Sequence, residues 1–214
     1  MFIKKLKKTY SSSQPILIED IFLLFPRFSR AYIFRLIKKA EENGELVKYS
    51  RGVYCLPKKT IFGEVTLSPF VVAESKYISN KHEVYGVYSG LTLLNQFEVT
   101  SQVPNNLEII TNNEATRKRD VCINGKKFIL RKSRFEITKD NFCYYVVLQL
   151  FSELGINTKL ENMAKQRVEE FIEKNDINIE KLIDYSMYFP AQVLKKLIGS
   201  GVLYGALQKQ STFY

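Results

Sequence analysis

Basic side chains near the amino terminus have the types and the spacing that suit recognition of DNA. Within residues 29–51 the candidate DNA-binding residues are Ser29, Arg30, Tyr32, Arg35, Lys38, Lys39, Lys48 and Arg51. Arginine pairs bidentately with guanine, which makes Arg30 and Arg35 candidates for contact with base edges. Lysine carries a mobile point charge that suits phosphate oxygens better. Arg51 is a candidate for a minor groove or a phosphate.

These side chains need a helix whose opposite face is buried. Apolar residues recur at the helical spacing i, i+3, i+4 and i+7, as Ile33, Leu36, Ile37 and Ala40. This periodicity predicts a helix with one buried stripe. Ser29 is a suitable N-cap for that helix, and Asn43 with Gly44 predicts its end in a left-handed cap. The basic face then lies opposite the stripe, as in a recognition helix.

Further elements are predicted around this helix. Residues 16–24 are typical of a short helix that ends before Pro26, and residues 4–10 can supply another. Residues 45–48 and 53–56 are typical of two strands, joined by a hairpin tip at 49–52. The order helix, helix, turn, helix, β-hairpin is that of a winged helix-turn-helix. The sequence therefore predicts a DNA-binding domain of this type over residues 1–58.

The charge of the chain is concentrated in the same segment. The 214 residues include 32 Lys and Arg against 22 Asp and Glu, a formal net charge of +10. Residues 1–58 hold twelve basic and five acidic side chains, a net charge of +7, whereas residues 59–214 hold twenty and seventeen, a net charge of +3. Such an excess attracts polyanions. The alternative interpretation is a winged helix that contacts only protein.

Composition argues against several other classes of protein. Hydrophobic residues make up 45% of the chain, which is enough for a packed core, and no apolar run has the ~18 residues of a membrane span. The first eight residues are too short in their apolar part for a secretory signal. Three widely spaced cysteines and a single histidine predict reduced thiols in the cytoplasm, no zinc site and no cofactor.

A second, mixed α/β domain with a helical C-terminal tail is predicted over residues 59–214, so the fold class is α+β. Strands are expected at 84–88 and 107–111, and helices at 70–78 and 91–97, the latter capped by Ser89. Asn124 and Gly125 favour a type I′ turn between strands 121–123 and 126–130. The tail is expected to contain helices at 139–154, 159–174, 179–185 and 191–198.

A second basic cluster surrounds the predicted hairpin. It comprises Arg117, Lys118, Arg119, Lys126, Lys127, Arg131, Lys132 and Arg134, against Asp120 alone within the segment. Side chains alternate between the faces of a strand, so only part of this set can share one surface. Two interpretations stay open. The cluster is either a solvated strand edge protected by charge, or a second polyanion surface that contacts flanking DNA or an RNA.

The central part of the chain resembles the AbiEi-type antitoxins of abortive-infection systems. The resemblance lies in the blocks Tyr88–Asn95, Thr100–Pro104 and Ile110–Asn112, in their order and spacing, and in the winged-helix ending at Asn43–Leu46 and Arg51–Tyr54. It implies an antitoxin of a type IV toxin–antitoxin pair that represses its own operon through inverted repeats. It also implies a nucleotidyltransferase-like toxin, opposed without a stable complex.

Enzymatic chemistry is not predicted. His82 stands in an expected exposed loop, and no Ser/His/Asp arrangement can be built around it. Cys143 lies in an apolar, aromatic-rich helix and is expected to be buried. Three hypotheses remain: an autoregulatory DNA-binding antitoxin, an RNA- or protein-binding regulatory module, and a nucleic-acid-modifying enzyme with a DNA-targeting head. Comparing the affinity for duplex DNA with that for RNA over a range of salt separates the first two hypotheses. Metal-dependent modification of nucleic acid would identify the third.

Overall fold

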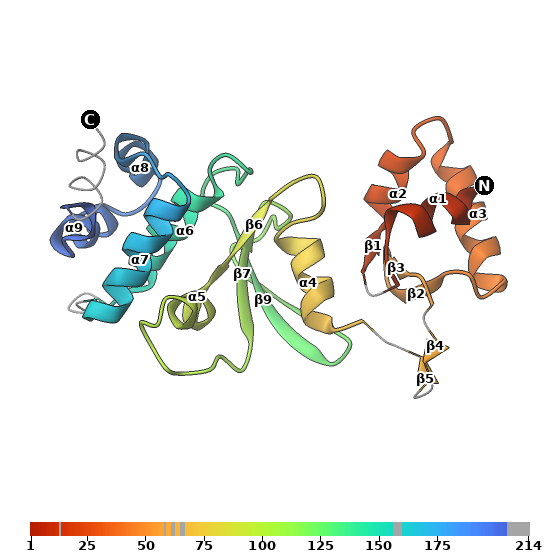
Figure 1. The fold of residues 1–214 in the computed structure, drawn as a ribbon, viewed down its shortest axis with the longest axis horizontal. Coiled ribbons are helices and arrows are strands. Elements are labelled where there is room, and N and C mark those ends of the chain that lie inside the picture. The colour runs from red at the N-terminus through yellow and green to blue at the C-terminus, as the bar shows by residue number, and fades with distance from the viewer. Residues whose placement is uncertain (13, 58, 61–62, 65–66, 156–159, 205–214) are drawn as a thin grey trace. The chain divides into compact units, whose positions relative to one another are not determined.

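The computed structural model describes residues 1–12, 14–57, 59–60, 63–64, 67–155 and 160–204 (Figure 1). The chain divides into two compact units, Met1–Lys76 and Tyr77–Tyr214. Helices and small sheets alternate along it, so the mixed α+β class predicted from the sequence is confirmed. The domain boundary predicted after residue 58 falls on Lys58, which lies outside the described residues, and it stays a prediction.

The first unit combines helices with a small antiparallel sheet (Figure 1). In chain order its elements are α1 (Phe2–Thr9), β1 (Ile16–Leu17), α2 (Ile18–Leu24), α3 (Arg30–Glu42), β2 (Val47–Ser50) and β3 (Val53–Cys55). The strands lie in the order β1-β3-β2, and both pairs are antiparallel. The pair β4 (Lys59–Thr60) and β5 (Gly63–Glu64) follows, and α4 (Pro69–Tyr77) crosses the division between the units.

The predicted details of α3 are confirmed. Ser29 is its N-cap, and the Ser29 hydroxyl accepts a hydrogen bond from the Tyr32 amide at 3.3 Å. Ile33, Ile37 and Ala40 are buried, while Leu36 is partly buried against the same core. Gly44 follows the helix with a φ of +67°, the left-handed conformation that glycine adopts without strain.

One predicted helix of the first unit is wrong at its start. Residues 16–24 were expected to be helical throughout, but Ile16 and Leu17 form β1 and pair with Tyr54 and Val53 of β3. The helix α2 begins only at Ile18. The cause is a tertiary contact. Pairing with the buried strand β3 gives the backbone N–H and C=O groups of this segment hydrogen-bond partners and buries both apolar side chains. The predicted hairpin tip is also shorter, since β2 extends to residue 50.

The second unit is built around one sheet and a group of helices (Figure 1). Its strands are β6 (Gly86–Ser89), β7 (Leu107–Thr111), β8 (Arg119–Ile123) and β9 (Lys126–Lys132), and its helices are α5 (Gly90–Gln96), α6 (Phe142–Glu153), α7 (Asn162–Lys174), α8 (Ile179–Ser186) and α9 (Ala191–Gly199). The strands lie in the order β6-β7-β9-β8. The central pair β7 and β9 is parallel, and the outer pairs are antiparallel.

The predicted hairpin and helical tail are confirmed in outline. Asn124 has a φ of +46° and Gly125 a φ of +79°, and a type I′ turn requires a positive φ at both positions. The tail contains α6 to α9 close to the predicted ranges. The start predicted for the second tail helix, Lys159, lies outside the described residues, and α7 begins at Asn162.

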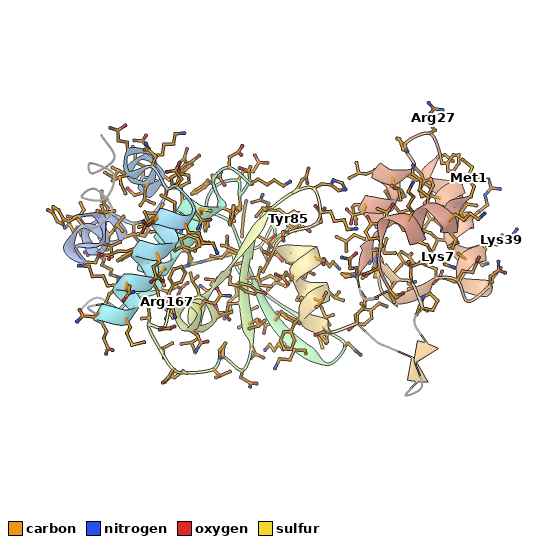
Figure 2. All side chains as sticks on the ribbon, viewed as in Figure 1. Met1, Lys7, Arg27, Lys39, Tyr85 and Arg167 are labelled. Carbon is orange, nitrogen blue, oxygen red and sulfur yellow. The ribbon has the colours of Figure 1, made fainter. Side chains whose placement is uncertain are left out.

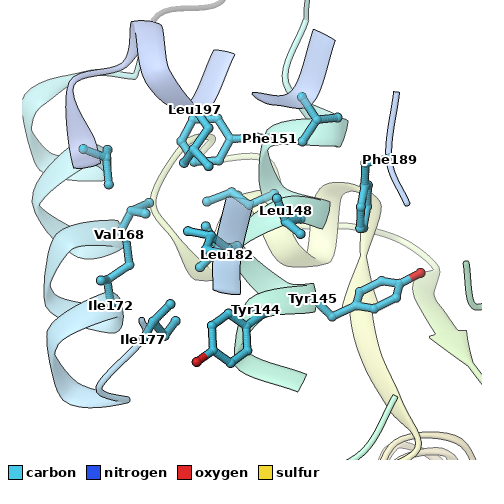
Figure 3. Packing of buried hydrophobic residues seen from close by; sticks show 14 of the residues in the cluster. Tyr144, Tyr145, Leu148, Phe151, Val168, Ile172, Ile177, Leu182, Phe189 and Leu197 are labelled. Atoms are coloured by element: carbon cyan, nitrogen blue, oxygen red, sulfur yellow. The ribbon is translucent and has the colours of Figure 1, made fainter. Parts of the chain in front are cut away.

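The helix α6 forms the centre of the second unit's core (Figure 3). Its residues Tyr145, Leu148 and Phe151 are fully buried among side chains from α7, α8 and α9. The Tyr145 hydroxyl accepts a hydrogen bond from the Arg134 amide at 3.0 Å, so even its polar atom is satisfied. Among the helices described here, none has both the length and the apolar character required to span a membrane.

Candidate nucleic-acid interface

The helix α3 exposes basic side chains on the face opposite its buried stripe. Arg35, Lys38 and Lys39 are exposed, while Ile33 and Ile37 face the core. Within the part of the chain that the structure describes, no carboxylate forms a salt bridge with any of the three basic side chains. Their charges are therefore available to a partner.

The two arginines predicted to read bases lie on different sides of α3. Five residues separate them, which corresponds to roughly 140° around a helix. The Arg30 guanidinium lies over the Phe22 ring of α2, 5.1 Å from the ring centroid. The Arg35 guanidinium lies 5.4 Å from the centroid of Tyr32 on its own helix. Both are exposed, and Arg35 lies about 60° from Lys38 around α3.

Two aromatic residues of α3 are half exposed. Tyr32 has 39% and Phe34 has 50% of its surface exposed. Tyr32 makes an edge contact with Phe28 at 5.1 Å, and Phe34 makes one with Phe22 at 5.9 Å. In the structure each ring packs on one side and is exposed on the other.

The β-hairpin of the first unit adds two further basic positions. Lys48 on β2 is exposed and pairs in register with Tyr54 of β3. Arg51 is exposed in the turn between the strands. Gly52 completes that turn with a φ of +74°, and its carbonyl accepts a hydrogen bond from the Ile18 amide at 2.9 Å. The turn that presents Arg51 is thus fastened to the start of α2.

The sequence-based site omitted two lysines of α1. Lys4 and Lys7 line a groove of about 620 Å³ together with Tyr32 and Lys39 of α3. Lys7 and Lys39, both labelled in Figure 2, line this groove from α1 and α3 respectively. The signal was present in the sequence as a run of lysines around buried Leu6. The run predicts a helix, but it does not indicate which of its lysines face α3.

The basic cluster of the second unit is partly neutralised, by Asp120 from within residues 117–134 and by two carboxylates from outside this segment. Arg119 forms a salt bridge with Glu114 at 2.8 Å, Lys127 with Asp120 at 2.7 Å, and Arg131 with Glu108 at 2.8 Å. Glu108 and Glu114 lie outside residues 117–134. The loop before β8 brings the Glu114 carboxylate to Arg119, and the pairing of β7 with β9 brings the Glu108 carboxylate to Arg131.

Glu114 is the most deeply buried of these partners, with 5% of its surface exposed. Its carboxylate accepts hydrogen bonds from the Thr116 amide at 3.0 Å, from the Thr116 hydroxyl at 2.8 Å and from Arg119 Nε at 2.8 Å. Burial alone raises the pKa of this carboxyl. The bonds from Thr116 and the charge of Arg119 outweigh burial, so the pKa is lowered overall.

The cluster also does not form a single surface. On β9, Lys126 and Lys132 share a face with buried Phe128, whereas Lys127 and Arg131 lie on the other face, as strand alternation predicts. The remaining members flank the strands. Arg117 and Lys118 are exposed before β8, and the Arg134 guanidinium lies over the Phe189 ring at 5.0 Å.

Ser89 is the N-cap residue of α5, as predicted, but its side chain makes no capping hydrogen bond. Its hydroxyl donates to Glu153 Oε1 at 2.8 Å and accepts from Gln149 Nε2 at 3.2 Å, both from α6. Ser89 is completely buried between β6 and α6, so the nearest partners of its hydroxyl are side chains of α6.

Other residues of the same sequence block also fasten the backbone. Asn95 Nδ2 donates to the carbonyls of Thr100 at 3.2 Å and Gln102 at 3.4 Å. Asn112 Oδ1 accepts from the Ile137 amide at 2.9 Å, and its Nδ2 donates to the Ile137 carbonyl at 2.8 Å. These contacts give the block a structural role in the second unit.

The single histidine and the cysteine of α6 have surroundings that do not resemble a catalytic site. His82 is exposed in a loop, as predicted. Cys143 is only partly buried; burial raises the pKa of its thiol, which donates to Asn175 Oδ1 at 3.3 Å. Across the described residues, His, Cys, Asp and Glu side chains do not gather in threes that could hold a metal ion.

The fold and surface define a two-unit α+β protein whose first unit exposes a basic helix. The chain belongs to DUF6088, a family of unknown function, whose sequence profile matches residues 3–180. The match therefore covers the first unit and most of the second. A comparison with curated proteins found none that matches this chain.

Proposed function

We propose that residues 1–58 form a winged helix-turn-helix that binds duplex DNA. The observation that carries this proposal is the exposed face of α3, where Arg35, Lys38 and Lys39 stand opposite a buried stripe and have no carboxylate partner among the described residues. The element order is compatible with the proposal, since three helices are followed by a hairpin that carries Lys48 and Arg51. A helix of this kind enters the major groove, and the hairpin lies beside it.

We further propose that the protein is an autoregulatory antitoxin that binds inverted repeats in its own operator. The resemblance to AbiEi-type antitoxins supports this part, and so does the concentration of positive charge in the first unit. The toxin would be a nucleotidyltransferase-like protein opposed without a stable complex. Co-expression of the full chain with the product of the adjacent gene tests the pairing through restored growth, and failure to restore growth contradicts it.

Binding to DNA is tested by fluorescence anisotropy with the full chain. The probes are a duplex from the region upstream of its own gene, a scrambled duplex and an RNA duplex of the same sequence, each titrated over a range of salt. We expect the upstream duplex to bind most tightly and its affinity to fall as salt rises. Equal affinity for RNA, or no binding to any duplex, would contradict the proposal. Catalysis that depends on added divalent metal would instead favour a nucleic-acid-modifying enzyme.

A single substitution sharpens this test. Arg35→Ala should cost ~1–3 kcal/mol for the preferred duplex and relax the choice of sequence. Arg167→Ala is the matched control, because it removes the same charge from an exposed arginine of the second unit that is paired with Glu98. If both variants bind like the wild type, Arg35 does not read bases.

Contact with a protein is the second candidate function for the first unit. An apolar groove of about 520 Å³ lies between the start of α1 and the turn after α2, lined by Phe2, Leu24, Phe25, Pro26 and Phe28, among others. Leu23 nearby has 65% of its surface exposed. Exposed apolar surface of this kind is typical of protein contacts. This candidate is favoured if the chain binds no nucleic acid in the anisotropy experiment.

A further inference from the structure

The groove between α1 and α3 has a chemical character that the proposed recognition face does not explain. It has a volume of about 620 Å³ and is lined by residues of α1, of α3 and of the segments that flank α3. Its basic lining residues are Lys4 and Lys7 of α1 and Lys39 of α3. Its aromatic lining residues are Phe2, Phe28 and Tyr32.

The ammonium groups of the three groove lysines are not paired with other groups of the described chain. Across the residues that the structure describes, Lys4, Lys7 and Lys39 form neither a salt bridge nor a side-chain hydrogen bond. Lys5 on the same helix is different. Its ammonium group donates to the Leu24 carbonyl at 2.7 Å and lies 5.0 Å from the centroid of the Phe25 ring.

The groove is therefore positively charged overall. Glu45 is its acidic lining residue, against three ammonium groups. A groove of this size also exceeds what a single inorganic anion needs, and its lysines come from two different helices. An extended anion with several charged groups matches this distribution better than a compact one.

The groove also has a defined position relative to the recognition face. Its lining residues Tyr32, Leu36 and Lys39 lie on the flank of α3 beside Arg35, about 40° to 100° from it around the helix. When a helix lies in a major groove about 12 Å wide, the phosphate backbones pass along its flanks. One backbone would thus meet the side of α3 that opens into the α1–α3 groove.

We propose that the α1–α3 groove holds one phosphodiester strand of duplex DNA beside the recognition helix. This inference rests on the proposed DNA-binding function and extends its interface to α1. Lys4, Lys7 and Lys39 pair with successive phosphates, and the rings of Phe28 and Tyr32 pack against the sugars between them. These contacts carry no sequence information, and they set the register of α3 on the duplex.

The test compares two neighbouring lysines of α1 in the full chain. Lys7→Ala and Lys8→Ala remove the same charge from adjacent exposed positions, but only Lys7 lines the groove. Affinities for the upstream duplex and for a scrambled duplex are measured by fluorescence anisotropy over a range of salt. Circular dichroism confirms that each variant is folded.

We expect Lys7→Ala to weaken binding to both duplexes roughly fivefold to tenfold at about 0.1 M salt, and to lower the salt slope by about 0.9. Lys8→Ala should leave the slope unchanged. The double variant Lys4→Ala with Lys7→Ala should lower the slope by about 1.8. Lys7→Arg should retain the wild-type slope, because it keeps the charge.

If the wild type binds DNA and Lys7→Ala and Lys8→Ala have equal effects, the groove does not hold the phosphodiester strand. The proposed DNA-binding function is then unaffected. A loss confined to the upstream duplex would also overturn the inference about the groove, because phosphate contacts act on every sequence alike. If the wild type binds no duplex at all, the proposed function itself fails. Binding of an acidic peptide in place of DNA would assign the groove to a protein partner and overturn the inference.

Discussion

The two units of this protein use their basic side chains in opposite ways. On α3 of the first unit, Arg35 and Lys38 are exposed and have no carboxylate partner within the described residues. In the second unit, Arg119, Lys127 and Arg131 each lie within 2.8 Å of a carboxylate oxygen. In the sequence both segments are clusters of basic side chains. The difference teaches that the charges of such a cluster stay available to a partner only where the fold brings no opposite charges to them.

Two serines illustrate the same contrast for hydrogen bonds. Ser29 and Ser89 each stand directly before a helix, and both have the residue type that favours an N-cap. Ser29 is exposed and caps α3, whereas Ser89 is buried and bonds to Glu153 of α6. A serine before a helix thus forms the expected capping hydrogen bond at the exposed helix end. At the buried helix end, side chains from elsewhere in the chain bind its hydroxyl instead.

The largest effect is expected from removing the exposed charges of α3. The triple variant Arg35→Ala, Lys38→Ala and Lys39→Ala should lower the affinity for duplex DNA by roughly two to three orders of magnitude at about 0.1 M salt. The salt slope should fall by about 1.8, because each of the two lysines loses a phosphate contact that contributes about 0.9, whereas Arg35 is assigned to base edges. Fluorescence anisotropy over a range of salt measures both quantities.

The matched control removes three charges from the second unit through Lys126→Ala, Lys127→Ala and Lys132→Ala. We expect this triple variant to retain the wild-type slope, since these side chains are divided between the two faces of β9. Equal losses in the two triple variants would break the comparison. They would show that the chain binds DNA through its net charge and not through α3.

The next effect concerns the two serines and is measured as a free energy of unfolding. Ser89→Ala removes a buried hydroxyl from between Glu153 and Gln149 and should destabilise the second unit by ~1–3 kcal/mol. Ser29→Ala removes an exposed cap and should cost about 1 kcal/mol in the first unit. Urea titrations followed by circular dichroism give both values. A negligible cost for Ser89→Ala would mean that α6 does not depend on this contact.

A smaller effect is expected at Glu114 and depends on pH. The pKa of this carboxyl is lower in the folded chain than in the unfolded one, so its ionised form stabilises the fold. That contribution is complete above the ordinary glutamate pKa of about 4.3 and is lost as the pH falls through the folded-state pKa. Glu114→Gln should cost ~1–2 kcal/mol at neutral pH. The difference between variant and wild type should shrink in urea titrations below about pH 4. If the difference in free energy of unfolding is the same at every pH, the charge of Glu114 does not stabilise the fold.

The smallest effect is expected at the exposed salt bridge of the β8–β9 hairpin. Asp120 and Lys127 each have about half of their side chain in solvent, so water and salt screen the pair. Asp120→Asn should leave the Tm unchanged within measurement error. It should also leave the affinity for DNA unchanged, although it makes the second unit more positive. A clear gain in affinity would show that paired charges on this hairpin still contribute to binding.

The sequence predicted correctly those elements that depend on interactions between residues close together in the chain. The stripe that contains Ile33 and Ile37, the cap at Ser29 and the turn at Asn124 all depend on residues within a few positions, and the structure confirms each. The mixed α+β class followed from the alternation of such elements.

Features that depend on distant residues could not be predicted in this way. The strand at Ile16 exists because β3 lies beside it, and no pattern at residues 16–24 indicates that neighbour. The partners of Arg119 and Arg131 lie before the basic cluster and reach it only through the loop at Glu114 and the pairing of β7 with β9. In α1, the run of lysines gave no way to separate Lys7, which lines a groove, from Lys5, which is bonded internally.

The strand order β6-β7-β9-β8 constrains how this sheet can assemble during translation. The ribosome releases β8 before β9, yet β9 is the strand with which β8 pairs. Until residues 126–132 have emerged, β8 lacks that partner and β7 keeps one edge of its backbone unpaired. The strand made last is therefore the one that fills the gap between β7 and β8. A nascent chain that pauses before residue 132 exposes an open, apolar strand edge, which is the state of a sheet most prone to association with other chains.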